Sequence, residues 1–169
     1  RNAIYYVEDI IRKEEPFSEW QIRNIHQLIL KNIDDENTGR YRQQNVLISG
    51  ATIILPDYTL LNDKMAQLVD WYNSQAYKLH PIERAAKVHA DFVSIYPFID
   101  GNGRTSRLLM NLELLKAGYP PCVITVENRL AYYEALDQWM AYGKTESFIK
   151  LVSDAVLEGF KPYQVILGL

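Results

Sequence analysis

Apolar residues recur at intervals of three and four along most of the chain, which is the spacing of amphipathic helices. One such run covers residues 1–15 and stops before Pro16, because a residue that precedes proline disfavours helical geometry. A second run follows Ser18, whose hydroxyl can accept hydrogen bonds from the amides of the next turn. Its apolar stripe consists of Trp20, Ile22, Ile25, Leu28 and Ile29. Both runs are predicted helices.

The second half of the chain repeats this helical pattern. It predicts helices from Leu60, from Pro81, over residues 126–142 and over residues 146–157. The run from Thr105 to Ala117 is apolar on nearly all sides, and Gly118 follows it as a C-terminal cap would. We therefore expect this helix to be the central and most buried one.

One segment departs from the helical pattern. Residues 45–56 contain two runs of mainly β-branched residues on either side of Gly50, which predicts a β-hairpin. No repeat or interdomain linker is evident. The expected fold is an all-α, compact domain over residues 1–169, with residues 81–117 as a helix-loop-helix core and the hairpin projecting from it.

Composition restricts the function further. The 169 residues, 48% hydrophobic, are enough for one core. Eighteen Lys and Arg against 21 Asp and Glu leave a net charge of −3, so we expect no nucleic-acid partner. No run approaches the roughly 18 apolar residues of a membrane span, so we expect no membrane partner and a cytoplasmic location. The chain begins at Arg1, and we interpret it as a fragment lacking an N-terminal segment.

The segment from Tyr96 to Arg107 gathers residues suited to phosphate chemistry. Gly101 and Gly103 flank Asn102 at the predicted start of a helix, where several amides can point into one concavity that attracts anions. Arg104 and Arg107 are three residues apart and share a helix face, while Asp100 could ligate Mg²⁺. A polyphosphate with a divalent ion fits these features. The alternative is a glycine-rich turn with solvated arginines and a capping aspartate.

This segment resembles the signature of the Fic-domain family, His-Pro-Phe-x-Asp/Glu-Gly-Asn-Gly-Arg-x-x-Arg, at every specified position except the first. The resemblance extends to residues 38–42, 79–83, 108–111, 117–121 and 132–136. It implies an all-helical core whose members bind ATP with Mg²⁺. Most of them transfer AMP to a protein hydroxyl, and minority branches move other phosphate-containing groups.

Carried over by position, the resemblance makes Asp100 the Mg²⁺ ligand and gives the α and β phosphates to the backbone of residues 101–103 and the Asn102 side chain. Arg104 and Arg107 would hold the outer phosphates. Phe98 would anchor the loop, and Tyr133 would lie near the adenine. The predicted hairpin would be a flap that docks a protein substrate by strand addition. Its apolar residues are Val46, Leu47, Ile48, Ile53 and Ile54.

The first motif position carries Tyr96 where the family has the histidine that accepts the proton of the attacking hydroxyl. A phenol with a pKa of about 10 must first ionise, which costs about 4 kcal/mol at pH 7, roughly a thousandfold in active base. We therefore expect this chain to bind nucleotide and to transfer AMP weakly or not at all. Two alternatives stay open: a nucleotide-binding module that holds a partner without turnover, and a transferase of another phosphate-containing group.

Several other residues are weaker candidates. His89 lies seven residues before Tyr96 and could relay a proton, although a core histidine is the favoured interpretation. His80 is expected to cap a helix, and His26 has no partner at metal-ligand spacing. Cys122 has no adjacent base that would activate a thiol.

Regulation and assembly are less defined. Relatives with an inhibitory helix carry the pattern Ser/Thr-x-x-x-Glu-Gly/Asn, to which residues 154–159 are a near miss with the wrong first residue. We expect such a helix, where present, upstream of Arg1. Met140 stands where many relatives have a polar residue, so nucleotide preference stays open, as does a homodimer.

Overall fold

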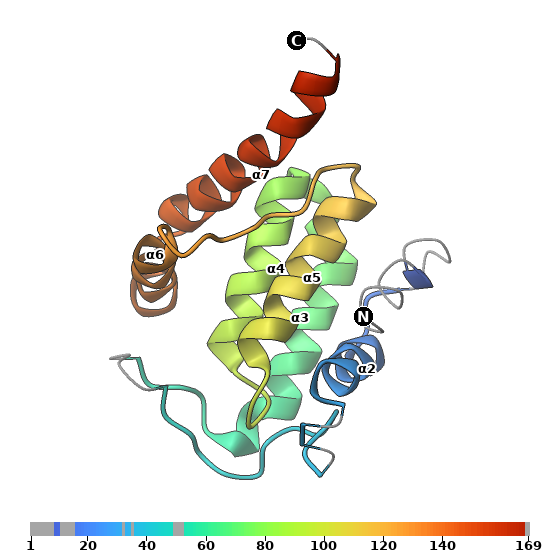
Figure 1. The fold of residues 1–169 in the computed structure, drawn as a ribbon. Helices are drawn as coiled ribbons and strands as arrows, with labels where there is room; N and C mark the ends of the chain where they lie inside the picture. The colour runs from blue at the N-terminus through green and yellow to red at the C-terminus, as the bar shows by residue number, and fades with distance from the viewer. Residues whose placement is uncertain (1–8, 11–15, 32, 35, 49–52, 168–169) are drawn as a thin grey trace.

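The computed structural model describes residues 9–10, 16–31, 33–34, 36–48 and 53–167. These form α2 (Glu19–Leu30), α3 (Leu61–Gln75), α4 (Pro81–Ile95), α5 (Asn102–Lys116), α6 (Arg129–Tyr142) and α7 (Glu146–Leu167), with two short 3₁₀ turns, η1 (Tyr58–Leu60) and η2 (Ala76–Lys78) (Figure 1). Because the described residues contain no strand, the all-helical prediction is confirmed for them. The helix predicted over residues 1–15 lies largely outside the described part.

Helices α3, α4 and α5 lie side by side at the centre, with α2 on one side and α6 and α7 on the other (Figure 1). The most extensive contact joins α4 to α5. The loop between these two helices, residues 96–101, is therefore fixed at both ends by the best-packed part of the bundle.

Helix α5 contributes to two separate apolar clusters. Leu109 and Leu112 pack with residues of α2, α3 and α4, while Met110 and Leu114 pack with residues of α4, α6 and α7. All four side chains are fully buried. The prediction that this helix is central is confirmed, but it is not the most buried one, because α4 and α5 each have eight buried residues.

The helix ends follow their predicted signals. Ser18 caps α2 by accepting from the Gln21 amide at 3.2 Å, and the His80 ring caps α4 by accepting from the Ile82 amide at 3.3 Å. Trp20, predicted to face the core, is instead 65% exposed. It stands two residues before buried Ile22, and two residues turn a helix by about 200°, to the opposite face.

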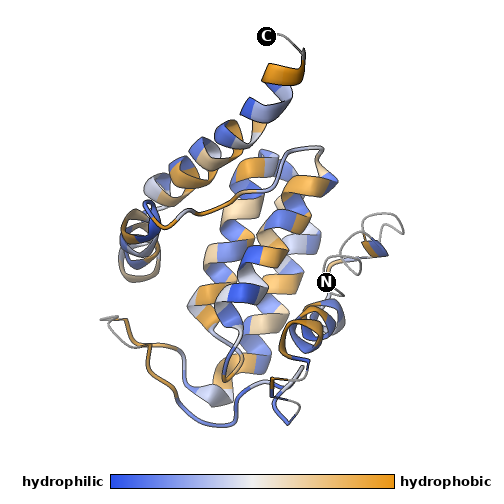
Figure 2. Cartoon of the chain, viewed as in Figure 1, coloured by the Kyte–Doolittle hydropathy of each residue, from blue (hydrophilic) through white to orange (hydrophobic). Residues whose placement is uncertain are grey.

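Helix α7 extends beyond its predicted end at residue 157 and continues through Pro162 to Leu167. Its last turns project past the bundle and expose Val165 and Ile166 (Figure 2). Because these turns bury few side chains, their sequence lacks the apolar spacing from which the helix end was predicted. No helix in the described part of the chain combines the length and apolar character needed to cross a membrane.

The β-hairpin predicted over residues 45–56 is wrong for the residues described, because neither 45–48 nor 53–56 forms a strand. Residues 49–52 lie outside the described part. Leu47 and Ile54 are 91% and 93% exposed, and a two-stranded ribbon without a packed face is marginal. Side chains join the two ends of the segment instead: the Asn45 amide group donates to Asp57 at 2.8 Å and accepts from the Tyr58 N–H at 2.9 Å.

A buried carboxylate ties the three central helices together. Glu113 of α5 is inaccessible to solvent and accepts hydrogen bonds from the Tyr72 hydroxyl of α3 at 2.7 Å and from Arg84 Nε of α4 at 3.0 Å. Lys116 lies 3.4 Å away on the same helix. The buried charge is thus compensated by donors from three helices.

We predict that Glu113→Ala lowers the free energy of unfolding by about 3 kcal/mol, because it leaves a guanidinium and a hydroxyl without their acceptor in a buried setting. Urea denaturation measures the change. Glu158→Ala, which removes an exposed ion pair with Lys161, serves as the matched control and should have a much smaller effect. Equal effects from the two variants would contradict the role assigned to the buried network.

Candidate functional site

The loop between α4 and α5 turns on two residues with left-handed backbone. Tyr96 ends α4 with φ 52° and donates its amide to the Phe92 carbonyl at 3.0 Å. A tyrosine rarely adopts this geometry, which costs of order 1 kcal/mol. Gly101, with φ 78°, precedes α5. An added Cβ there would lie 3.1 Å from His26 Nε2, so both the backbone angle and the space favour glycine.

Asn102 closes the loop from within. Its side-chain oxygen accepts from the Phe98 N–H at 2.9 Å, and its side-chain nitrogen donates to the Phe98 carbonyl at 2.8 Å. Both residues are buried, and the Phe98 ring stacks on the His26 ring with centroids 3.6 Å apart. The Asn102 side chain that the resemblance assigned to phosphate therefore braces the loop backbone, and Phe98 occupies the anchoring position expected of it.

His26 of α2 holds the same loop from outside. Its Nδ1 accepts from the Gly39 amide at 2.9 Å, so in the neutral ring Nε2 carries the proton and donates to the Asp100 carbonyl at 2.9 Å. Burial lowers the pKa of His26 below its ordinary value, which favours this neutral form. Metal-ligand spacing, the pattern by which His26 was assessed in the sequence, does not reveal this role. Its position four residues after Ile22, on the buried face of α2, indicates a contact inside the protein.

Arg42 supplies a third support that sequence reasoning missed. Its amide donates to the Pro97 carbonyl and its Nε donates to the Tyr96 carbonyl, both at 2.9 Å. In the sequence it lies within residues 38–42, which the family resemblance includes, but that match does not indicate which carbonyls it binds. Its supporting role becomes evident only in the tertiary structure.

The charged groups lie on the open side of this loop. Asp100, with a side chain 62% exposed, accepts from the Gly101 N–H at 2.6 Å and from Arg104 Nη2 at 2.9 Å. Arg107 is exposed and extends back over Gly103, where an added Cβ would meet its Nη1 at 3.4 Å. The first amides of α5 have no acceptor within the helix. Two guanidinium groups thus lie beside a helix N-terminus, an arrangement whose charge suits an anion, and we call it the candidate anion seat.

The donor set around Asp100 fits Mg²⁺ only in one binding mode. Within the described ranges, no three His, Cys, Asp or Glu residues are grouped so as to hold a metal ion by themselves. Mg²⁺ is usually bound through one or two carboxylates together with phosphate oxygens and water. A single exposed carboxylate beside the candidate anion seat matches that mode, so the ion would bind together with a phosphate ligand.

Tyr96 and Tyr133 come together at this site. Burial, followed by the charge of Asp100 and a smaller contribution from Tyr133, raises the pKa of the Tyr96 phenol, while a hydrogen bond with Asn102 opposes the shift. Tyr133 of α6 is 50% exposed and its ring contacts buried Tyr132. The shift disfavours a phenolate at the position where a base is expected.

The other candidates lie in the core. His89 is buried, with its Nε2 2.9 Å from the Tyr132 hydroxyl and its ring stacked on Phe148, which confirms the core interpretation. Cys122 is buried and its pKa is raised to about 11 by burial, so it has no nucleophilic character at neutral pH.

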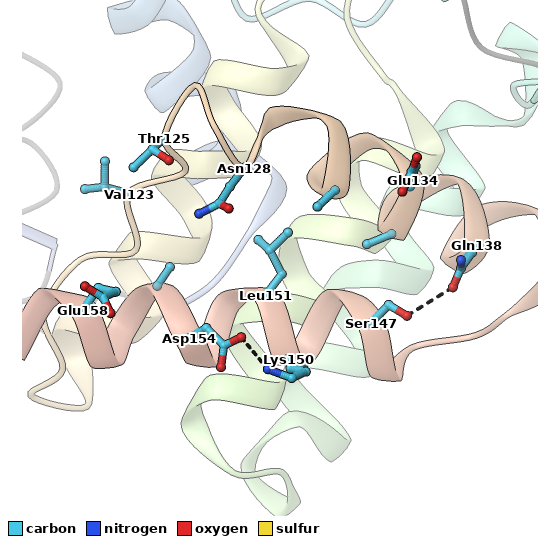
Figure 3. A pocket seen from close by; sticks show the side chains of 13 residues that line it. Val123, Thr125, Asn128, Glu134, Gln138, Ser147, Lys150, Leu151, Asp154 and Glu158 are labelled. Atoms are coloured by element: carbon cyan, nitrogen blue, oxygen red, sulfur yellow. Dashed lines mark hydrogen bonds and ion pairs between the residues drawn. The ribbon is translucent and has the colours of Figure 1, made fainter.

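A separate hollow of about 360 Å³ lies between α6, α7 and residues 123–128 (Figure 3). Its lining includes Glu134, Gln138 and Lys150, with Ser147 donating to Gln138 at 3.1 Å and Lys150 paired with Asp154 (Figure 3). No residue of the 96–107 segment lines it. This hollow is therefore distinct from the candidate anion seat.

These features define a helical bundle with a glycine-rich loop at a helix N-terminus. The model of the Fic/DOC family matches residues 16–114. Protein adenylyltransferase Fic of Nematostella vectensis is 40% identical over 153 residues, covering 89% of this chain and 35% of that protein. Protein adenylyltransferase fic-1 of Caenorhabditis briggsae is 40% identical over 116 residues, covering 68% and 22%.

A solved structure of Fic-1 from Caenorhabditis elegans matches with a TM-score of 0.87 and 31% identity, over 98% of this chain and 49% of that one. The chain therefore belongs to the Fic/DOC family, and the resemblance seen in its sequence is confirmed. It spans between 22% and 35% of the length of the two curated relatives described above.

We predict that the free energy of unfolding decreases as the pH is lowered, partly because the buried His89 ring must stay neutral. Burial lowers its pKa to about 3, whereas an unfolded imidazole titrates near 6.5. Its contribution is therefore complete above about pH 6.5 and is lost as the pH falls toward 3. Between pH 7 and pH 5 the unaltered chain should lose about 2 kcal/mol from this group, a loss that His89→Gln removes. Urea denaturation at both pH values measures it; identical losses in the two proteins would contradict the assignment.

Proposed function

We propose that the chain binds ATP with Mg²⁺ and belongs to an enzyme that transfers AMP to a hydroxyl of a target protein, with transfer impaired here by Tyr96. The observation that carries the proposal is the braced loop. Asn102 holds its backbone, and Asp100, Arg104 and Arg107 lie around the N-terminus of α5. Membership of the Fic/DOC family and relatives named protein adenylyltransferase support the same reaction.

The residues have separate roles in this proposal. The amides of Gly101, Asn102 and Gly103 bind the α and β phosphates, which requires the Gly101 amide to leave its contact with the Asp100 carboxylate. Arg104 and Arg107 hold the outer phosphates that leave as pyrophosphate. Asp100 would hold Mg²⁺, which when bound neutralises phosphate charge. To reach a phosphate, the Arg104 guanidinium must leave its contact with Asp100, and 40% exposure of its side chain allows that movement. Tyr133 lies on the adenine side.

The target would dock on residues 45–48 and 53–56, where Leu47 and Ile54 are almost fully exposed and Val46, Ile48 and Ile53 are partly buried. These exposed apolar side chains can contact an extended segment of another protein. No preformed hairpin is required for that contact.

Transfer forms a bond between the target oxygen and the α phosphorus, breaks the bond to pyrophosphate and requires a base for the hydroxyl proton. Tyr96 occupies the position of that base, and burial raises the pKa of its phenol further. The same observation favours a second candidate function, a module that binds nucleotide and holds a partner without turnover.

We expect Tyr96→His to increase label transfer from α-labelled ATP to lysate proteins at least a hundredfold, because a neutral imidazole is abundant at pH 7 whereas a phenolate is roughly a thousandfold rarer than the phenol. Gel autoradiography with and without Mg²⁺ measures the transfer. Asp100→Asn in the same background should abolish it, since the ion then lacks its carboxylate.

Transfer from γ-labelled but not α-labelled ATP would replace the proposal with a phosphate transferase. Absence of transfer from either label, combined with calorimetric binding of ATP, would favour the binding module. Vigorous transfer by the unaltered chain would contradict the role assigned to Tyr96.

A further inference from the structure

Arg42 is buried, 3% exposed, and its hydrogen bonds go to backbone carbonyls. Within the described residues it forms no ion pair. Burying a guanidinium is costly unless its donors are satisfied. An apolar side chain of similar size would leave the contacted carbonyls without this donor, so packing alone does not account for an arginine here.

The four carbonyls that Arg42 contacts belong to two separate functional regions. Its amide and Nε bind the carbonyls of Pro97 and Tyr96, at the start of the motif loop, each at 2.9 Å. Its Nη1 binds the Gln44 carbonyl at 2.9 Å and its Nη2 binds the Pro56 carbonyl at 2.7 Å. Gln44 immediately precedes residues 45–48, and Pro56 is the last of residues 53–56.

The geometry points to Arg42 as a positioning residue that fixes the proposed target-docking residues, 45–48 and 53–56, relative to the reaction centre at Tyr96. This inference rests on the proposed function. The planar guanidinium presents donors in fixed directions, so one side chain sets the spacing between the two regions. Transfer needs the target oxygen and the α phosphorus in near-attack geometry, and a displacement of 1 Å can cost about a hundredfold in rate.

A protein acceptor needs the docking residues, whereas water as acceptor does not. Water attacks the same α phosphorus, forms AMP, releases pyrophosphate and gives its proton to the base, but it requires no docking surface. The motif loop also keeps its other supports, because Asn102 and His26 bind it independently of Arg42. Loss of the Arg42 guanidinium should therefore impair transfer to protein far more than hydrolysis.

The test uses the Tyr96→His background, with Arg42→Met and Arg42→Lys compared against Arg40→Met. Arg40 is an exposed arginine two residues earlier and provides a matched control. Label transfer to lysate proteins and AMP formation in buffer are measured with α-labelled ATP, and ATP affinity is measured by calorimetry. Thermal unfolding reports whether each variant is folded.

We expect Arg42→Met to lower the ratio of protein transfer to hydrolysis at least tenfold, with the ATP dissociation constant and the KM for ATP changed less than twofold. Arg42→Lys, which keeps one cationic donor group, should fall between, and Arg40→Met should retain the ratio. An equal fall in both reactions, or an unchanged ratio in folded Arg42→Lys and Arg42→Met, would overturn the inference.

A second measurement does not depend on activity. Nitrogen-15 relaxation on the chain without ATP should show lower order parameters at Asn45 and Leu55 in Arg42→Lys, with α4 and α5 unchanged. If Tyr96→His transfers no label and forms no AMP, the proposed function fails while this measurement still decides the positioning role. Unchanged order parameters at both residues would overturn it.

Discussion

The hydrogen bonds that fix the backbone between α4 and α5 are the constraint on which the rest of the site depends. Asn102 bonds both backbone groups of Phe98 from within the loop, and His26 and Arg42 bind the carbonyls of Asp100, Tyr96 and Pro97 from outside. With these groups satisfied, the two left-handed residues keep their geometry at the N-terminus of α5. These hydrogen bonds, from Asn102 within the loop and from His26 and Arg42 outside it, offset the backbone strain at Tyr96.

The bundle explains why this loop can be rigid. Helices α4 and α5 contribute to both apolar clusters, so each end of the loop continues into a helix that is packed on two sides. The parts proposed to meet the target have less support, because Leu47 and Ile54 are exposed and their segment is closed by polar contacts. A loop fixed at both ends beside a weakly packed segment is consistent with the proposed binding of one nucleotide and an extended protein partner.

Sequence patterns predicted the features that depend on local periodicity and on the motif. Helix positions, the caps at Ser18 and His80, and burial of α5 all follow from side-chain spacing within single elements. The residues of the candidate anion seat could be singled out because they lie within one short segment, and their binding of an anion stays a prediction. The chain's family membership follows from the same residues, which a family model and several relatives match.

Features that depend on tertiary contacts could not be predicted. His26 and Arg42 bind loop carbonyls that lie far away in the sequence. The helical spacing of His26 and the family resemblance around Arg42 mark these residues but do not indicate which carbonyls they bind. The hairpin prediction failed because β-branched residues form strands only where a sheet or core covers one face. Helix α7 continued past its apolar stripe because a helix can propagate with little burial once it has begun.

Calorimetric titration of ATP with Mg²⁺ into the chain and into Asn102→Ala measures whether nucleotide binding depends on the loop that Asn102 holds. Asn111→Ala is the matched control, because Asn111 makes the same kind of two-point bond to the Cys122 backbone elsewhere on α5. The account predicts that the chain and Asn111→Ala bind ATP with similar affinity, while Asn102→Ala binds at least tenfold more weakly although it remains folded. Equal affinity in all three proteins, or no binding by the unaltered chain, would contradict it.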